Sequence, residues 1–213
     1  SAGAGVFSLN KAITLQPGPG SMDILTISDS IADGSANSVP ATSPVLFYNP
    51  GTNAYQQSLT QNGPGISYLA VANTYSGGTT LAQGTLKITF DASLGLSSTS
   101  LDVTGSATLQ LAANIAGMTR PITLSSNSLT IDTQAFSLAT SGIISGVGGS
   151  LTKIGSGTLT LSGANTYTGL TTVSTGTLNL NSSTPNAIPG NVTVSGGNLV
   201  LQQSNQIAAA SNV

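Results

Sequence analysis

A thirty-residue stretch of this chain occurs twice, and this repetition constrains the fold more than any other feature. The full copy, residues 151–180, is LTKIGSGTLTLSGANTYTGLTTVSTGTLNL, and a degraded copy is SYLAVANTYSGGTTLAQGTLKI at 67–88. Every matching pair lies 92 residues apart (165 minus 73): Asn73 and Asn165, Tyr75 and Tyr167, Gly77 and Gly169, and Gly84 and Gly176. Scattered coincidences would not keep one unbroken offset, so the two copies indicate a repeated structural unit.

Short runs of alternating apolar and polar residues surround the two copies, about eight to twelve residues apart, with Gly, Asn or Ser-Gly between them. No stretch shows a helical period with capping residues, so the pattern predicts an all-β chain. The strands expected from residue 57 onward are 57–60, 66–71, 79–81, 85–90, 100–103, 107–111, 122–124, 128–131, 136–139, 151–154, 158–161, 171–173, 177–180, 192–194 and 198–201.

An all-β chain of short strands can be a sandwich, a barrel or a solenoid. The internal repeat favours a solenoid, because each coil meets the same environment as its neighbours. We expect one β-solenoid over 1–213, with a loop-rich excursion at 30–56 and repeat units near 66–95 and 151–180. Coils of about 20–30 residues would give about nine coils, with the paired positions on the same side of the rod.

The composition excludes several functions. Charged residues make up 5% of the chain, with four cations and six anions, and His and Cys are absent. Four cations supply no basic stripe for nucleic acid. Disulfide chemistry and a serine hydrolase of the usual kind are also excluded, since both need residues that the chain lacks.

The acidic residues offer two candidate chemistries, and neither has the spacing that it needs. Asp23, Asp29 and Asp33 do not follow a calcium-loop pattern, and Asp33-Gly34 is an ordinary turn pair. Glycosidase chemistry needs two facing carboxylates, and a β-helix lyase would need more cations than Arg120. The other acids are isolated in the sequence: Asp91, Asp102 and Asp132. We therefore expect no catalytic, cofactor-binding or metal-binding residue.

The residues that recur in both copies can be interpreted structurally or functionally. Asn73 and Asn165 are expected to bond backbone at corners, with ligand binding as the alternative. Tyr75 and Tyr167 are expected to cover apolar loops with their hydroxyls in water, with sugar stacking as the alternative. Glycines between the strands are expected at positive-φ corners, since no phosphate-binding pattern occurs: Gly155, Gly157, Gly163, Gly169 and Gly176.

The pattern GxGTLTLSGANTYTGxTTVxxGTLxL at 155–180 resembles the passenger-associated transport repeat of autotransporters, the type V secreted proteins of Gram-negative bacteria. The sequence departs from that pattern at Leu170, where a second glycine is usual, and at 68–71. The resemblance implies a right-handed parallel β-helix outside the cell. It also implies a non-enzymatic stalk that carries adhesive parts and aids secretion-coupled folding, without a cofactor.

A second hypothesis is an extracellular fibre subunit that assembles by stacking solenoids end to end. Residues 1–10 and 206–213 offer no charged caps, and uncapped strand edges favour pairing with another chain. We therefore expect end-to-end self-association or continuation in a longer chain. No apolar run has the roughly twenty residues of a membrane-spanning helix, so direct membrane insertion is not expected. The sequence names no host or neighbouring-cell ligand.

Overall fold

The computed structural model describes residues 58–208 throughout and, before them, the backbone of six short strands. These strands are β1 (Val6–Leu9), β2 (Ile13–Leu15), β3 (Ile24–Ile27), β4 (Ser30–Asp33), β5 (Phe47–Asn49) and β6 (Ala54–Gln56). β1 pairs with β4 in parallel, and β5 pairs with β6 in antiparallel fashion. β4 begins the segment expected as a loop-rich excursion, most of which lies outside the described residues, as do Asp23 and Asp29.

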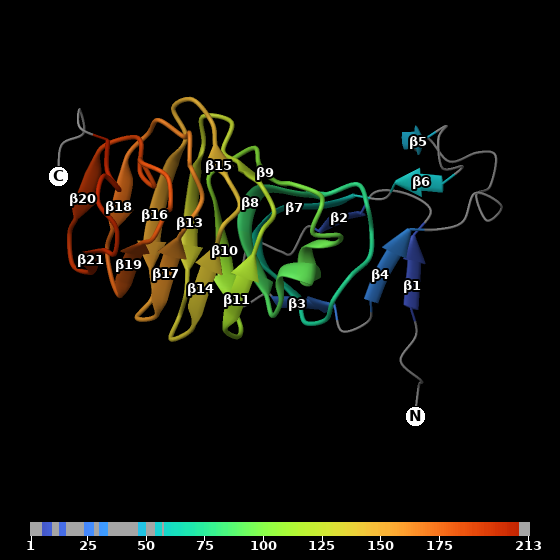
Figure 1. Ribbon diagram of the computed structural model, residues 1–213. Coiled ribbons are helices and arrows are strands. Elements are labelled where there is room, and N and C mark those ends of the chain that lie inside the picture. The colour runs from blue at the N-terminus through green and yellow to red at the C-terminus, as the bar shows by residue number, and fades with distance from the viewer. Residues whose placement is uncertain are drawn as a thin grey trace.

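The chain from Leu59 onward winds as a parallel β-solenoid of about seven turns (Figure 1). Its strands are β7 (Leu59–Leu69), β8 (Thr79–Ile88), β9 (Leu101–Val103), β10 (Ala107–Leu111), β11 (Ile115–Met118), β12 (Ile122–Thr123), β13 (Ser128–Asp132), β14 (Ser137–Thr140), β15 (Ile144–Ser145), β16 (Ser150–Ile154), β17 (Thr158–Leu161), β18 (Thr171–Val173), β19 (Thr177–Leu180), β20 (Val192–Val194) and β21 (Asn198–Leu201). Between β8 and β9 lies a single 3-10 turn, η2 (Asp91–Leu94). The prediction of an all-β solenoid is confirmed. Among the described residues, no helix combines the length and apolar character that crossing a membrane requires.

The coils stack their strands on three faces. The first face is built from β2, 59–61 of β7, 79–81 of β8, β9, β12 and β15. The second face runs from β3, 66–69 of β7 and 84–88 of β8 through β10, β13, β16, β18 and β20. The third face holds β11, β14, β17, β19 and β21. β7 and β8 each run around the corner between the first two faces, which is why strands expected separately from the sequence are continuous.

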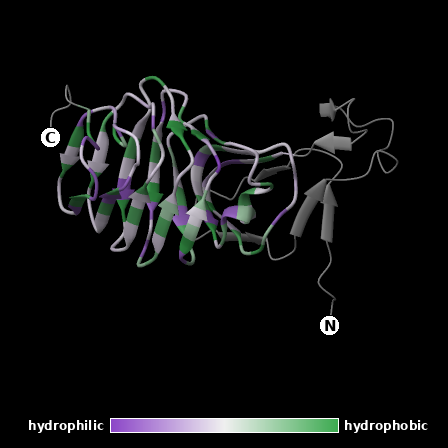
Figure 2. Cartoon of the chain, in the orientation of Figure 1, coloured by the Kyte–Doolittle hydropathy of each residue, from purple (hydrophilic) through white to green (hydrophobic). Residues whose placement is uncertain are grey.

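Alternation places one side of most strands from β7 to β19 in the interior. Figure 2 shows hydrophobic and hydrophilic residues alternating along the strands of the coils. On the second face, Leu86, Leu109 and Ile131 stack at equivalent positions and are fully buried. Each such side chain contributes about 1.5–3 kcal/mol relative to an exposed one. The stack of apolar ladders is therefore the main stabilising feature of the rod.

The two copies of the repeat lie on different faces, which corrects the expectation that they share one side. Successive pairing takes Gly84 through Ala107, Leu129 and Leu151 to Thr171. Four coils thus use 87 residues (171 minus 84), fewer than the offset of 92. The five extra residues carry Gly176 past the next corner, directly before β19 on the third face. The second copy therefore lies one face further around the rod, because an offset of 92 residues is not a whole number of coils.

Candidate functional site

The first buried corner consists of Asn73, Tyr75 and Thr79, in and just after the loop between β7 and β8. The Asn73 side chain donates from Nδ2 to the carbonyl of Ser93 at 2.6 Å. The hydroxyl of Tyr75 lies 2.6 Å from Oγ1 of Thr79, which itself donates to the carbonyl of Leu94 at 3.1 Å. Since Thr79 donates its only proton to Leu94, Tyr75 donates to Thr79. The corner therefore binds the backbone of the following coil.

The second buried corner consists of Asn165, Tyr167 and Thr171 and repeats this arrangement. Asn165 donates from Nδ2 to the carbonyl of Ala187 at 2.7 Å, and its Oδ1 accepts the amide proton of Ile144 at 2.8 Å. The hydroxyl of Tyr167 lies 2.7 Å from Oγ1 of Thr171. Each asparagine thus bonds the backbone of a neighbouring coil.

Both tyrosines are fully buried, so the expectation that their hydroxyls lie in water is wrong. Burial raises the pKa of Tyr75 well above its usual range, although the hydrogen bond with Thr79 and the charge of Arg120 oppose this shift. Burial likewise raises the pKa of Tyr167 to about 12, opposed by the hydrogen bond with Thr171. Neither ring offers a face on which a sugar could stack.

Near its C-terminal end, each repeat copy contains a turn that only glycine fits. Gly84 and Gly176 have φ values of 74° and 68°. A Cβ atom on Gly176 would lie 2.3 Å from the carbonyl oxygen of Gly155 and 2.4 Å from that of Gly157. A Cβ atom on Gly84 would meet the carbonyl oxygens of the matching residues, 63 and 65, at 2.0 and 2.6 Å. The two turns therefore have the same local environment although they lie on different corners.

The expected positive φ at the remaining repeat glycines holds only in part. Gly155 has a φ of 82°, whereas no positive φ occurs at Gly157, Gly163 or Gly169. At these three residues a Cβ atom would instead lie 1.8–2.6 Å from a carbonyl oxygen of the neighbouring coil. These three glycines are thus required by close packing of coil on coil rather than by backbone conformation.

Two buried polar side chains donate hydrogen bonds to the backbone of these turns, and neither was identified from the sequence. Gln61 and Lys153 are 92 residues apart and fully buried. Gln61 donates from Nε2 to the carbonyl of Gly63 at 2.9 Å. Lys153 donates from Nζ to the carbonyls of Ile154 and Gly155, both at 2.9 Å. The sequence did contain a signal for Lys153. It lies two residues after Leu151, so an alternating strand places both side chains on the same, inward side.

Lys153 occupies an interior position that is otherwise apolar. Its neighbours in the ladder are Ile131 on β13 and Val173 on β18. Burial lowers the pKa of Lys153 to about 8, and the negative charge of Asp132 opposes this shift. Burying a charge is costly unless it is paired and hydrogen-bonded. The carbonyls of the turn supply that compensation, so Lys153 acts as a structural donor.

Arg120 is a second fully buried cation, located between β11 and β12. Its Nε lies 2.5 Å from Oδ1 of Asp91, and its Nη2 donates to the carbonyl of Asp91 at 2.8 Å. Its guanidinium also donates to the carbonyls of Leu94 and Gly95, at 3.0 and 3.1 Å. With its donors directed at one loop, this arginine holds η2 and the residues after it.

The structure does not bring the candidate acids together. Asp91 pairs with Arg120, and Asp132 accepts hydrogen bonds from Gln110 and Gln134. Asp102 lies half-buried on β9, on the first face. Within the described part of the chain, no group of three or more acidic side chains could hold a metal ion. The carboxylates of Asp91 and Asp132 are thus engaged in structural contacts.

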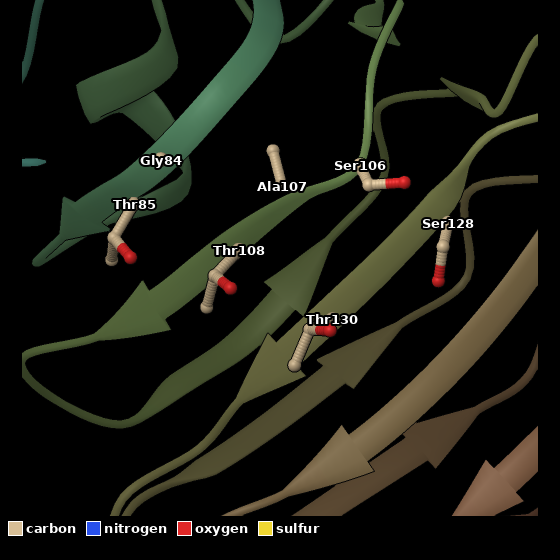
Figure 3. Close-up of a pocket in the computed structure, with 7 residues that line it drawn as sticks. All are labelled: Gly84, Thr85, Ser106, Ala107, Thr108, Ser128 and Thr130. Carbon is tan, nitrogen blue, oxygen red and sulfur yellow. The ribbon is translucent and has the colours of Figure 1, made fainter. Parts of the chain in front are cut away.

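The outer side of the second face carries a ladder of threonines that pair from strand to strand: Thr85, Thr108, Thr130, Thr152, Thr172 and Thr193. A shallow hollow lies over its first three coils. Figure 3 shows the threonine side chains of β8, β10 and β13 leaving their strands on the same side. The hollow is lined by Gly84, Thr85, Ser106, Ala107, Thr108, Ser128 and Thr130. None of these side chains titrates near neutral pH, so the hollow has no group for acid–base chemistry.

Comparisons with known proteins agree with this geometry. The passenger-associated-transport-repeat family matches residues 59–88 and 151–180, so the chain carries two copies of this repeat. The chain is also similar to the adhesin BmaC autotransporter of Brucella suis biovar 1 (strain 1330), with 40% identity over 120 residues. That match covers 51% of this chain and 4% of the adhesin, so the chain corresponds to a small part of that relative. No solved structure gives a significant match.

Proposed function

We propose that this chain is a non-enzymatic stalk segment of an autotransporter-type passenger, displayed outside a Gram-negative cell, which also aids folding during secretion. The observation that carries the proposal is the pair of transport repeats built into one continuous coil. In such a coil each turn contacts only its neighbours, so added turns lengthen a rod without changing its cross-section. A rod of this kind holds other segments away from the cell surface.

We include adhesion in the proposal because the chain is similar to an adhesin. We assign the described coils the role of carrying and spacing adhesive parts, because three of their charged side chains are engaged in internal contacts. Arg120 and Asp91 bond each other, and Lys153 bonds its own turn. These contacts also support a non-enzymatic role, since a catalytic acid or base needs access to a substrate.

Surface display tests this proposal. The chain would be placed between an N-terminal epitope with a secretion signal and the translocator of an autotransporter, and protease-accessible epitope would be measured on intact cells. We expect the native sequence to support display, because coil-by-coil folding outside the cell opposes backsliding. Equal display by a chain of the same composition in shuffled order would contradict the proposed role in secretion.

A specific observation favours the second candidate, an assembling subunit. Val194 on β20 and Leu201 on β21 are 42% and 51% exposed. Their partners one coil earlier, Val173 and Leu180, are fully buried. Within the described residues no further strand pairs with β20 or β21. We propose that this edge is continued by a further coil, either from a longer chain or from a second copy of this one, as open strand edges favour.

Sedimentation velocity over a wide concentration range checks this association. We expect the native chain to form elongated oligomers and Leu201→Lys to shift it to monomers, because a charge would be buried at the contact. Val147→Lys is the matched control, since Val147 is 80% exposed and lies in a loop between β15 and β16. A native chain that stays monomeric at every concentration would refute the association.

A further inference from the structure

We propose that each repeat copy is one part of a three-coil lock, in which a corner, a loop and a buried side chain from three successive coils hold one another. The corners are those defined above. The first strap is residues 91–96 and the second strap is residues 182–188. The pins are Arg120 and Gln206, each from the coil after its strap. The repeat alone is thus an incomplete unit that later coils complete.

The first strap lies directly on the first corner. Besides the side-chain bonds of Asn73 and Thr79, the Leu96 amide donates to the carbonyl of Tyr75 at 3.1 Å, and the Asn73 amide donates to that of Ala92 at 2.8 Å. A Cβ atom on Gly95 would lie 2.6 Å from the ring of Tyr75. The strap therefore packs against the tyrosine with its backbone and excludes water from the corner.

The pin, Arg120, bonds the same strap from the following coil. The carbonyl of Leu94 accepts from Thr79 at 3.1 Å and from Nη1 of Arg120 at 3.0 Å, so one strap atom joins the corner to the pin. Arg120 also bonds Asp91 and Gly95, near the two ends of the strap. Loss of either partner leaves buried polar groups of the other unsatisfied, which couples the three parts energetically.

The second copy has a comparable arrangement with a neutral pin, in which the corner and the pin side chain bond different residues of the strap. The strap carbonyl of Ala187 accepts from Asn165 of the corner. Gln206 is 1% exposed, donates from Nε2 to the carbonyl of Ser182 at 3.0 Å, and accepts the Ser182 amide proton at 2.7 Å. The amide of Ile188 donates to the carbonyl of Gln206 at 2.9 Å. Gln206 lies 86 residues after Arg120 rather than 92, so the two pins are not matching residues of the repeat, but each bonds the strap of the coil before it.

Hydrogen exchange of the full chain tests the lock. We expect Asn73→Ala and Arg120→Met each to accelerate exchange of the Leu96 amide about tenfold or more, because the strap then opens locally. The Ile188 amide of the second strap should keep its protection in both variants. Asn165→Ala and Gln206→Ala should give the reverse pattern, and Gln206→Ala removes no charge, so the second lock stays testable if Arg120→Met does not fold.

Double variants distinguish a lock from general weakening. Residues that act as a unit give non-additive effects, whereas distant residues give additive ones. We expect Asn73→Ala and Arg120→Met to be non-additive in unfolding free energy, and Asn73→Ala and Asn165→Ala to be additive. Lys87→Met is the control, because Lys87 lies on β8 over the ring of Tyr68 and outside both straps. Uniform loss of protection over both straps, or additivity within one lock, would overturn the proposal.

Discussion

Gly176→Ala is expected to destabilise the chain by about 2–5 kcal/mol, the sum of a left-handed backbone penalty and overpacking. The φ of 68° disfavours any side chain at this residue. The new Cβ atom would also meet two carbonyl oxygens at 2.3 and 2.4 Å and Nζ of Lys153 at 2.8 Å. Since these neighbours belong to the coil below, relief requires the coils to separate. Urea unfolding followed by circular dichroism measures the loss.

Gly117→Ala is the matched control for this substitution. Gly117 lies in a strand, β11, and a Cβ atom there would find no atom within 4 Å. We expect a change within about 0.5 kcal/mol, as for most surface substitutions. If both variants lose the same stability, the contact between neighbouring coils at Gly176 is not what requires glycine. The same pair can be compared in the display assay, where only Gly176→Ala should reduce surface epitope.

Lys153→Gln is expected to make the chain more stable at pH 7 and to remove part of its pH dependence. The folded-state pKa of Lys153, about 8, lies below the ordinary value of 10.5. Between these values the unfolded chain binds a proton that the folded chain does not, so the native chain gains stability as pH rises from about 8 to 10. Below pH 8 both states are charged and the full cost of burial is present. Glutamine at this position would act as Gln61 does in the first copy.

The stability gain at pH 7 is expected to be about 1 kcal/mol after allowance for solvent screening, and it should shrink toward zero near pH 10. Urea midpoints of the native chain and the variant at pH 7, 8, 9 and 10 measure both effects. Lys87→Gln makes the same charge change on the outer side of β8 and is the control for the loss of one cation. A constant difference between native chain and Lys153→Gln across this range would show that burial of the charge is not the cause.

Local features of the chain were predictable because they depend on short-range rules. Strict alternation located most strands of the coils, and the 92-residue offset identified residues whose contacts recur, as the hydrogen bonds of Tyr75 and Tyr167 show. The two-residue strand β15 was missed because it is too short to show alternation, and β11 was missed because its residues IAGM do not alternate. The buried state of the tyrosines was also missed, because the straps that cover them lie outside the recurring pattern.

The sequence by itself therefore determined the fold class, most of the strands and the positive-φ turns at Gly155 and Gly176, because backbone conformation and alternation are local properties. Only the tertiary structure decided which face each copy occupies, since this depends on the number of residues in each coil. The tertiary structure also decided that Arg120 acts as a pin, because Arg120 and its partner Asp91 are 29 residues apart and belong to different coils. A buried arginine looks like any other arginine in the sequence, and only the stacking of one coil on the next removes it from water and gives it its partners.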